Sequence, residues 1–261
     1  MTYETIIYEV EEPIGILTLN RPEAMNAVNL QLLTDSYNAL CEMEADPAIK
    51  VIVIKGSENV FAAGADIKQF STMNAFEARE FIQQVHKTIF KIEDNLKPVI
   101  TAIRGVALGG GLEMCLASDI RVAADNATFG LPEINLGIYP GGGGTQRMPR
   151  LAGLGNAMEY VLTGDFFPAT RAYEMGLLNY IVPAEEVVPT AMKLAKKISK
   201  KSVLAVRMAK SAVNRSMDTD IKTGSLLEQE GFSMLFASHD QQECMCAFVE
   251  KRKAVMNGKG K

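Results

Sequence analysis

The chain has 261 residues, of which 48% are hydrophobic and 22% are charged, and its formal net charge is −4. A chain of this length and composition can bury a large core, which excludes a small scaffold that depends on disulfides or a structural metal. The mild acidity gives no overall electrostatic attraction to nucleic acid or anionic lipid. No uncharged apolar stretch approaches the ~18 residues that a membrane-spanning helix requires.

The cysteines, the histidines and the N-terminus indicate the compartment and the chemistry. None of the four cysteines has the paired spacing of a metal site; they are Cys41, Cys115, Cys244 and Cys246. Residues 1–4 do not resemble the start of a secretory signal, so we expect a protein of the reducing cytoplasm, without a metal. Both histidines, His86 and His239, are expected at the surface. An enzyme with this sequence would therefore use carboxylates as its acid and base.

Extended and helical patterns alternate through the first half of the chain. The β-branched run 51–54 is typical of a strand that is buried on both faces, and a further strand is expected over 99–103, after Pro98. A helix over 75–94 opens at Asn74 and has Glu77 at the capping-box position. The other expected elements are a hairpin of 5–10 with 14–19, helices over 30–45 and 112–117, and a strand over 120–123. This order predicts a mixed α/β core with right-handed crossovers.

Beyond Pro183 the pattern becomes almost entirely helical. A last helix opens at Ser238, with Gln241 at the capping-box position. The helices expected before it cover 188–198, 205–213 and 221–236. Because these helices have no strand partner, we expect an appended helical layer that makes subunit contacts. The predicted division is a core of residues 1–195 and a helical region of residues 196–261.

The stretch 187–217 contains eight Lys or Arg residues and no acidic residue. The simplest interpretation is a solvated helix face. Two alternatives are a surface that attracts an anionic ligand and a secondary RNA-binding surface. Since the whole chain is mildly acidic, we expect no nucleic-acid partner.

The strongest sign of chemistry is the turn Gly109-Gly110-Gly111, between an expected strand and helix. Such a turn lets backbone approach a ligand, and it leaves N–H groups unpaired where an oxyanion would be stabilised. Tight packing would explain one or two of these glycines. It does not explain Glu113, an ionisable side chain in the apolar run 112–116. Motifs of a hydrolase triad, a zinc protease, a P-loop and a standard nicotinamide fold are absent from the sequence.

A second carboxyl group has a similar setting. Glu133 lies in an apolar loop, twenty positions after Glu113, and the strand over 120–123 separates the two. They can converge on one pocket if strand and loop fold back. A converged pair suits acid and base catalysis, because burial and mutual repulsion hold one proton between two carboxyls near neutral pH.

Two further segments are rich in small residues. Residues 61–68 permit close backbone approach, and Lys68 could meet a phosphate; alternatively, the segment is a tight connection in which Asp66 caps a helix. Residues 140–147 contain four consecutive glycines, which by themselves indicate a mobile loop or the entry of a helix.

In this order and spacing, the segments resemble the crotonase (enoyl-CoA hydratase/isomerase) superfamily, essentially end to end. The resemblance is carried by 19–22 with 26–27, 62–67, 109–111 with Glu113, 132–133, 140–147 and 247–252. It implies an α/β fold, with a crotonase-like ββα spiral core and a C-terminal helical trimerisation region. It also implies a homo-hexamer built as a dimer of trimers, and no resident cofactor, since coenzyme A is part of the substrate.

The same resemblance implies the residues of an acyl-CoA site. The backbone N–H groups of Ala65 and Gly110 would hold the thioester oxygen as an oxyanion hole. Phe248 and Lys251 would approach coenzyme A, often from a neighbouring subunit. The adenine and pantetheine portions of the substrate would lie along Ala63, Asp66, Ile67 and Lys68.

The presence of both glutamates resembles the hydratase branch, which adds water reversibly to a 2-enoyl-CoA thioester to give a 3-hydroxyacyl-CoA. We assign Glu113 as the principal base toward water and Glu133 as the principal acid toward Cα, with the roles exchanged in dehydration. One alternative is an enoyl-CoA isomerase in which Glu133 shuttles a proton. Another, from a different class, is an RNA-binding or scaffold protein that has retained the fold.

Three positions depart from the commonest pattern of the superfamily. Glu23 stands where many relatives carry Lys, Leu131 replaces a frequent Gln, and Tyr139 stands where a small or aliphatic residue is common. Leu131, Tyr139 and Gly141 are expected to line the acyl pocket. These changes would suit a hydratase specialised for a branched or cyclic acyl group, or they reflect neutral drift.

Overall fold

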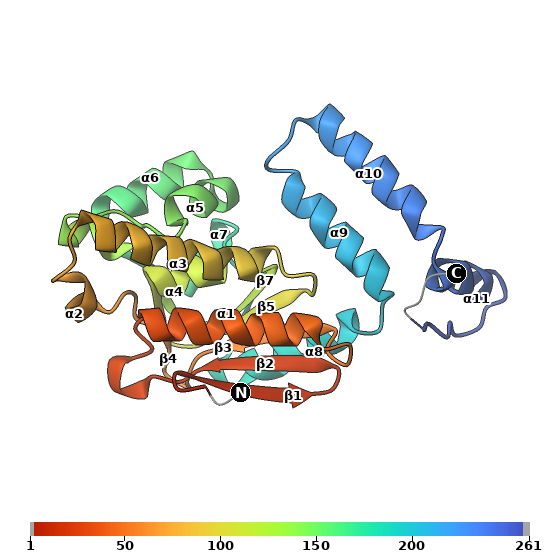
Figure 1. Cartoon of the computed structure of the whole chain (residues 1–261), viewed down its shortest axis with the longest axis horizontal. Helices are drawn as coiled ribbons and strands as arrows, with labels where there is room; N and C mark the ends of the chain where they lie inside the picture. Colours follow the sequence, from red (N-terminus) through yellow and green to blue (C-terminus); the bar gives the residue numbers. More distant parts are fainter. Residues whose placement is uncertain (1–2, 258–261) are drawn as a thin grey trace.

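The structure, a computed structural model, describes residues 3–257 (Figure 1). Its strands form two sheets. The larger sheet has the order β1-β2-β3-β5-β7-β10, with the bounds Ile6–Glu11, Ile14–Leu19, Val51–Lys55, Val99–Ile103, Ile120–Ala124 and Tyr180–Val182. The smaller sheet has the order β4-β6-β8-β9, with the bounds Val60–Ala62, Val106–Leu108, Thr128–Gly130 and Phe166–Pro168.

Successive turns of the chain place one strand in each sheet, in the pairs β3 with β4, β5 with β6 and β7 with β8. Helical segments follow each pair: α2 and α3 the first, α4 the second, and η2 and α5 the third. Their bounds are Ile67–Phe70, Ala75–Glu93, Gly110–Leu116, Pro132–Leu136 and Gly144–Ala152. This arrangement is the predicted spiral of ββα turns, and the α/β fold class is confirmed.

The core of the larger sheet is built from the β-branched runs that the sequence shows. Every residue of β5 is buried, as are the first four of β3, and these two strands pair in parallel. Helix α8 (Val187–Ile198) packs against β3, β5 and β7, and its buried residues are Val187, Ala191 and Ala195. The spacing of four residues places these three on one helix face. Helix α1 (Leu30–Ala45) packs on β1, β2 and α3.

One of the two expected capping boxes forms. At the start of α3, the side chain of Asn74 accepts hydrogen bonds from the backbone, and the carboxylate of Glu77 accepts one from Asn74 N–H. At the start of α11 (His239–Val249), Ser238 Oγ accepts from Gln241 N–H, but the Gln241 side chain donates to Met245. The helix at Asn74 therefore has both hydrogen bonds of a capping box, and the helix at Ser238 has only the bond accepted by the N-cap side chain.

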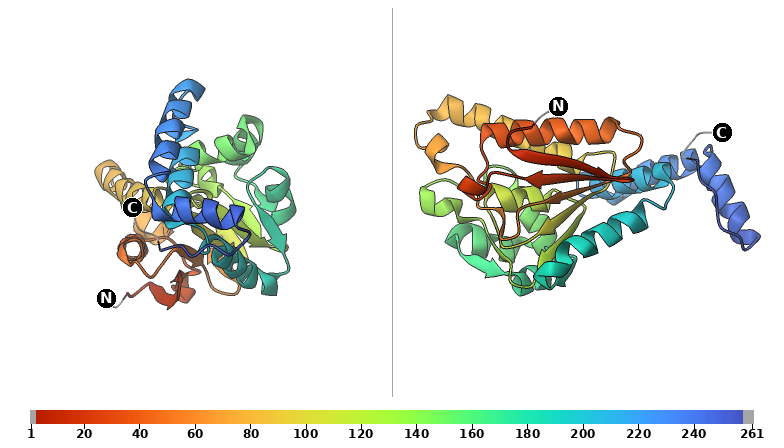
Figure 2. Two further views of the ribbon diagram at one scale, coloured as in Figure 1. Left: turned by 90° about the vertical axis from the view of Figure 1, so that its right-hand side faces the viewer. Right: turned by 90° about the horizontal axis from the view of Figure 1, so that it is seen from below.

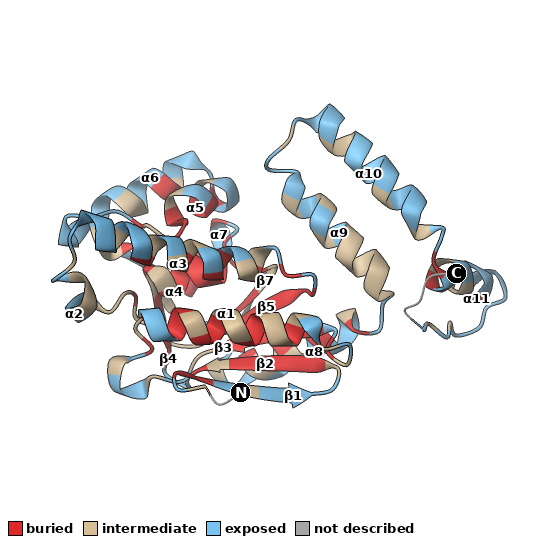
Figure 3. Cartoon of the chain, in the orientation of Figure 1, coloured by how far each residue is buried: buried red, intermediate tan, exposed pale blue. Residues whose placement is uncertain are grey.

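The helices α9 (Val203–Arg215), α10 (Ile221–Leu235) and α11 extend away from the two sheets (Figures 1 and 2). Neither α9 nor α10 contains a buried residue (Figure 3). The expectation of an appended helical layer fits these helices, but it is wrong for α8, whose apolar face covers the sheet. The division at residue 195 falls inside α8 and remains a prediction.

Four further elements complete the described chain: η1 (Pro22–Ala24), α6 (Leu154–Thr163), α7 (Ala169–Glu174) and η3 (Ala184–Glu186). Helix α6 packs against α5 and η2. Within residues 3–257, no helix has both the length and the apolar character that crossing a membrane requires.

Candidate active site

Three neighbouring strands of the smaller sheet end at one edge. Strand β4 pairs in parallel with β6, and β6 pairs in parallel with β8. Segments that follow parallel strands emerge at the same edge of the sheet. The loop 63–66, the turn at Gly109 and Gly110, and the segment 131–133 are therefore gathered in one place.

Glu113 lies in the first turn of α4, with 3% of its surface exposed. Its Oε1 atom accepts hydrogen bonds of 2.8 Å from the backbone N–H groups of both Gly142 and Gly144, in and after the loop that leads into α5. Burial raises the pKa of Glu113, while these two hydrogen bonds and the positive charge of Arg147 limit that rise. A buried carboxyl group in an apolar helix thus has the partners that its burial requires.

Glu133 lies in η2, with its carboxyl group against the glycine turn. A Cβ atom at Gly109 would lie 2.9 Å from Oε1 of Glu133. The Oε2 atom is buried and has no hydrogen-bond partner among residues 3–257. Burial and, next, the negative charge of Glu113 raise the pKa of Glu133 to about 7. The structure thus brings the two carboxyl groups close enough for the charge of Glu113 to act on Glu133.

Glycine is needed at the positions of these two turns for different physical reasons. Gly64 and Gly109 have φ values of +103° and +48°, a region that other residues rarely adopt. The two turns touch, since the Cα atom of Gly64 is 3.5 Å from the place of a Cβ atom on Gly109. At Gly111, a Cβ atom would lie 2.6 Å from the carbonyl oxygen of Ala62, so this third glycine serves close packing.

The backbone N–H groups of Ala65 and Gly110 lie on these two adjacent turns. Val28 holds the first turn, because its N–H donates to Gly64 O and its carbonyl oxygen accepts from Asp66 N–H. Within the described chain, neither Ala65 N–H nor Gly110 N–H donates to a protein acceptor. Both residues are partly accessible. Two unpaired donors on touching turns can stabilise one oxyanion.

The loop expected to bind coenzyme A has an ion pair at its end. Asp66 is the N-cap residue of α2, as the alternative of a strand-to-helix connection predicts, but its side chain makes no capping hydrogen bond. Its Oδ2 atom instead lies 3.2 Å from Nη2 of Arg21. Ala63 N–H donates to Met25 O, and Ile67 is exposed. A surface pocket is lined by Asn29, Leu30, Gln31, Asp66, Lys68 and Gln69. This pocket adjoins the turn of Ala65 and can receive an extended polar ligand.

The expected acyl-pocket residues differ in depth. Leu131 is fully buried. A Cβ atom built on Gly144 would lie 3.0 Å from Cδ1 of Leu131 and 3.1 Å from Oε1 of Glu113. Gly141 faces the side chain of Ile82 on α3. Tyr139 is largely exposed. Leu131 therefore lies near the carboxyl group of Glu113, and Tyr139 lies at the outside of the same segment.

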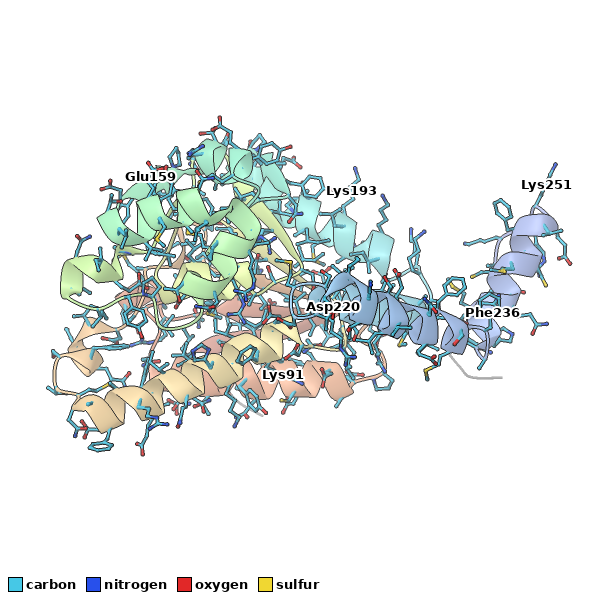
Figure 4. The ribbon with its side chains drawn as sticks, turned by 90° about the horizontal axis from the view of Figure 1, so that it is seen from above. Lys91, Glu159, Lys193, Asp220, Phe236 and Lys251 are labelled. Carbon is cyan, nitrogen blue, oxygen red and sulfur yellow. The ribbon has the colours of Figure 1, made fainter. Side chains whose placement is uncertain are left out.

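Phe248 and Lys251 do not reach this site within one chain. Phe248 is 85% exposed at the end of α11, and Lys251 follows that helix. Helix α11 and the α2 end of the loop lie at opposite ends of the molecule (Figure 1), and Figure 4 shows Lys251 at the outer tip. Their expected contacts with coenzyme A require a neighbouring copy of the chain.

The histidines and the loop before α5 differ from expectation. His239 is exposed, as expected, whereas His86 is only partly exposed, because its ring stacks on that of Phe90 with ring centroids 5.7 Å apart. The glycine run 141–144 leads into a helix, α5, as the helix-entry interpretation predicted. Its N–H donation to Glu113 was not foreseen, because a glycine run carries no sign of its partner. No group of three potential metal ligands occurs in residues 3–257.

A spiral of ββα turns that sets two carboxyl groups beside two unpaired backbone N–H groups defines an acid–base enzyme of the crotonase class. The chain belongs to the enoyl-CoA hydratase/isomerase family, whose model matches residues 9–259.

Relatives and solved structures cover nearly the whole chain. A protein from Syntrophomonas wolfei named crotonyl-CoA hydratase is 47% identical over 255 residues, which cover 97% of this chain and 98% of the relative. A short-chain-enoyl-CoA hydratase from Clostridium acetobutylicum is 41% identical over 254 residues, with 97% of each chain covered. The crystal structure of an enoyl-CoA hydratase from Bacillus anthracis matches with a TM-score of 0.94 at 36% identity and covers 98% of this chain and 100% of that one.

Proposed function

We propose that this protein is an enoyl-CoA hydratase, a hydro-lyase that adds water reversibly to a 2-enoyl-CoA thioester and gives a 3-hydroxyacyl-CoA. The observation that carries the proposal is the convergence of Glu113 and Glu133 beside the unpaired N–H groups of Ala65 and Gly110. The names of the relatives, crotonyl-CoA hydratase and short-chain-enoyl-CoA hydratase, support a short 2-enoyl group as substrate.

The surroundings of the two carboxyl groups support different roles for them. Two N–H donors and the charge of Arg147 stabilise the ionised form of Glu113. Glu133 Oε2 has no hydrogen-bond partner within residues 3–257, and the pKa of Glu133 is raised to about 7. Burial raises the pKa of both groups, and we assign the single proton of the pair to Glu133 because Glu113 accepts two backbone hydrogen bonds that favour its ionised form, whereas Oε2 of Glu133 accepts none from residues 3–257. Glu113 is ready to accept a proton, and Glu133 is ready to donate one.

In hydration, Glu113 removes a proton from water as the water oxygen bonds to C3 of the enoyl group. The electrons of the double bond shift to the thioester oxygen, where the N–H groups of Ala65 and Gly110 stabilise the charge. Glu133 then delivers its proton to Cα, and the thioester carbonyl re-forms. Glu113 has gained the proton that Glu133 lost, and proton exchange restores the starting state. Loss of one oxyanion donor would raise the barrier by about 3 kcal/mol.

Replacement of either carboxyl group by an amide tests this assignment. We expect Glu113→Gln and Glu133→Gln to lower hydration of crotonyl-CoA by about 10² to 10⁴-fold, with circular dichroism unchanged. Glu159→Gln on the exposed side of α6 (Figure 4) is the control and should keep full turnover. Turnover like that of the wild type in either active-site variant would contradict the two-carboxylate mechanism.

Hydration and isomerisation are distinguished with labelled water. In H₂¹⁸O, a hydratase places the label on the product hydroxyl. Migration of the double bond without label would instead support the isomerase alternative, in which Glu133 alone moves the proton.

We further propose that the chain assembles into trimers, paired as a hexamer, through α9–α11. These helices carry apolar side chains that are more than half exposed, among them Val213, Ile221, Leu226, Phe232 and Met234. Exposed apolar surface of this extent is typical of an interface. A neighbouring α11 would also bring Phe248 and Lys251 to the coenzyme A loop, which the same chain cannot do.

Mixed oligomers test the shared site. Glu113→Gln lacks the base, and the double variant Phe248→Ala with Lys251→Ala lacks the expected coenzyme A contacts. If those contacts come from a neighbour, the turnover of co-assembled subunits exceeds the summed turnover of the two separate variants. Some mixed sites then combine an intact Glu113 from one subunit with intact Phe248 and Lys251 from the other. Activity equal to that sum, or a monomer by native mass spectrometry, would refute the shared site.

The proposed steps need no resident cofactor or metal, because the chain supplies both proton transfers and both oxyanion donors. All four cysteines are free thiols, which supports a reducing, cytoplasmic compartment. The ammonium group of Lys210 lies 2.8 Å from Asp119, and its side chain is 8% exposed. This lysine is therefore paired within the chain, which weakens the RNA-binding alternative. A surface pocket on α8 is lined by Pro189, Met192, Lys193, Lys196, Lys197 and Lys200, which fits a solvated basic face.

A further inference from the structure

The loop 142–144, whose N–H groups donate to Glu113, contacts the side chain of Arg147 on α5. The Nη1 atom of Arg147 lies 3.4 Å from the carbonyl oxygen of Gly142, whose N–H group donates to Glu113. A Cβ atom on Gly143 would overlap Nη1 of Arg147, and φ at Gly143 is +107°. The guanidinium group thus lies directly against the backbone of the loop and does not touch the pocket through its own side chain.

Glu93 fixes the guanidinium group in this position. Arg147 Nε donates to Oε1 of Glu93 at 3.2 Å, and Nη2 donates to Oε2, which makes a two-point contact. The guanidinium carbon also lies 5.3 Å from the ring centroid of Phe90, one turn earlier on α3. A two-point contact between arginine and carboxylate fixes orientation as well as distance. The Arg147 side chain is 10% exposed and that of Glu93 is 32% exposed, so the guanidinium group is shielded while water reaches the carboxylate from one side.

The position of Glu93 is fixed in turn by α9. Asn214 Nδ2 donates a 3.0 Å hydrogen bond to the carbonyl oxygen of Glu93 at the last turn of α3. Asn214 therefore links α9 to the end of α3 that carries Glu93.

We propose that Glu93 and Arg147 are a positioning pair for hydration, which holds the loop 142–144 so that its N–H groups keep the Glu113 carboxyl group in place toward water. The inference rests on the proposed function for its kinetic part. Neither side chain touches the reacting atoms, and both act through the hydrogen bonds of Gly142 and Gly144.

The charged groups around Glu113 are few. Glu133 of η2 and Arg147 of α5 act on it directly, and Glu93 of α3 acts through Arg147. Strands β4 and β6, which also pack on α4, contain no charged residue. His86 of α3 stacks on Phe90, the ring that Arg147 covers. Loss of the Arg147 charge therefore leaves Glu133 as the main charge near Glu113.

Glu93→Gln separates positioning from chemistry, because it keeps the charge of Arg147 and loosens its orientation. We expect kcat for crotonyl-CoA to fall between roughly 10-fold and 100-fold, with KM nearly unchanged. Hydrogen exchange at the amides of 142–144 should become faster. Glu93→Asp, which retains a carboxylate, should recover part of both losses.

Glu44→Gln is the matched control. Glu44 on α1 forms a 2.6 Å ion pair with Lys91, which lies on α3 as Glu93 does. This pair joins α3 to α1 and does not contact the loop. We expect this variant to lose a similar amount of thermal stability and to keep kcat and the exchange rates of the loop. Equal effects of Glu93→Gln and Glu44→Gln on both readouts would overturn the positioning role.

Arg147→Met and Arg147→Lys separate charge from geometry. Without the positive charge, the pKa of Glu113 rises, so the acidic limb of the kcat profile should move to higher pH in Arg147→Met. Lysine keeps the charge and loses the two-point contact, so Arg147→Lys should lower kcat with a smaller movement of that limb. An unmoved limb in Arg147→Met would overturn the electrostatic part of the proposal.

Amide exchange does not depend on turnover, and this keeps the inference separate from the proposed function. If the wild type hydrates no enoyl-CoA while Glu93→Gln still loosens the loop, the proposed function fails and the positioning pair stands. If the wild type is active and the loop of Glu93→Gln exchanges as in the wild type, the positioning pair fails alone.

Discussion

The backbone N–H of Gly142 donates a 2.8 Å hydrogen bond to Oε1 of Glu113, a residue 29 positions earlier in the chain. This bond joins the loop before α5 to the helix after the glycine turn. It gives a buried carboxyl group, which would be costly alone, a hydrogen-bond donor that lowers the cost of its burial. The geometry leads to four predictions on activity and stability.

The first prediction concerns the space at Gly142. A Cβ atom there would overlap Oε2 of Glu113 and lie 2.8 Å from Cγ1 of Val85. We expect Gly142→Ala to displace the carboxylate and to lower kcat/KM about 100-fold, as measured with crotonyl-CoA. Gly155→Ala is the control, because a Cβ atom there meets nothing within 4 Å and helix α6 tolerates alanine. Equal activity of the two variants would show that the loop adapts freely.

The second prediction concerns the pH dependence of turnover. The pKa of Glu133 is about 7, and the active form of the pair carries one proton. We therefore expect kcat/KM for hydration to fall as the pH rises through about 7, because Glu133 then loses the proton that it must donate. Dehydration should fall in parallel, since both directions use the singly protonated pair. A hydration profile that stays level up to pH 9 would contradict the acid role of Glu133.

The third prediction concerns stability. Between the ordinary glutamate pKa of about 4.3 and about 7, folded Glu133 retains a proton that the unfolded chain has released. The free energy of unfolding therefore falls as the pH rises through this interval. Glu133→Gln removes this dependence, so we expect a gain in Tm over the wild type at pH 8 that exceeds any gain at pH 5. Equal changes at the two pH values would show that Glu133 does not titrate in this range.

The fourth prediction separates packing from substrate contact in the acyl-pocket segment. Leu131 is fully buried, so Leu131→Ala should lower the free energy of unfolding by about 2 to 5 kcal/mol through the cavity it creates. Tyr139 is 68% exposed, so Tyr139→Ala should leave Tm within a degree or two and change the ratio of kcat/KM between short and bulky enoyl-CoA thioesters. Thermal unfolding and a substrate series measure the two effects. An unchanged ratio would place Tyr139 outside the acyl pocket.

The sequence predicted the local elements well, because their signals are local. The runs at β3 and β5 and the capping box of Asn74 with Glu77 lie where expected. Two differences came from contacts that have no local signal. The sequence predicts that α8 lies apart from the sheet, but its apolar face covers the sheet. Asp66 is the N-cap residue of α2 as predicted, but its side chain pairs with Arg21 and makes no capping hydrogen bond.

By itself, the sequence determined that two glutamates sit in apolar segments beside glycine turns, because residue type and neighbours are written in the chain. The tertiary structure decided which of them has hydrogen-bond donors and which has none among the described residues, because these partners come from a loop 29 and 31 positions away from Glu113. The structure also placed α11, which contains Phe248, at the end of the molecule opposite α2 in the same chain, with Lys251 at its outer tip. Hydrogen bonds and electrostatic interactions act over a few ångströms, so the roles of these side chains follow from the fold that sets their distances.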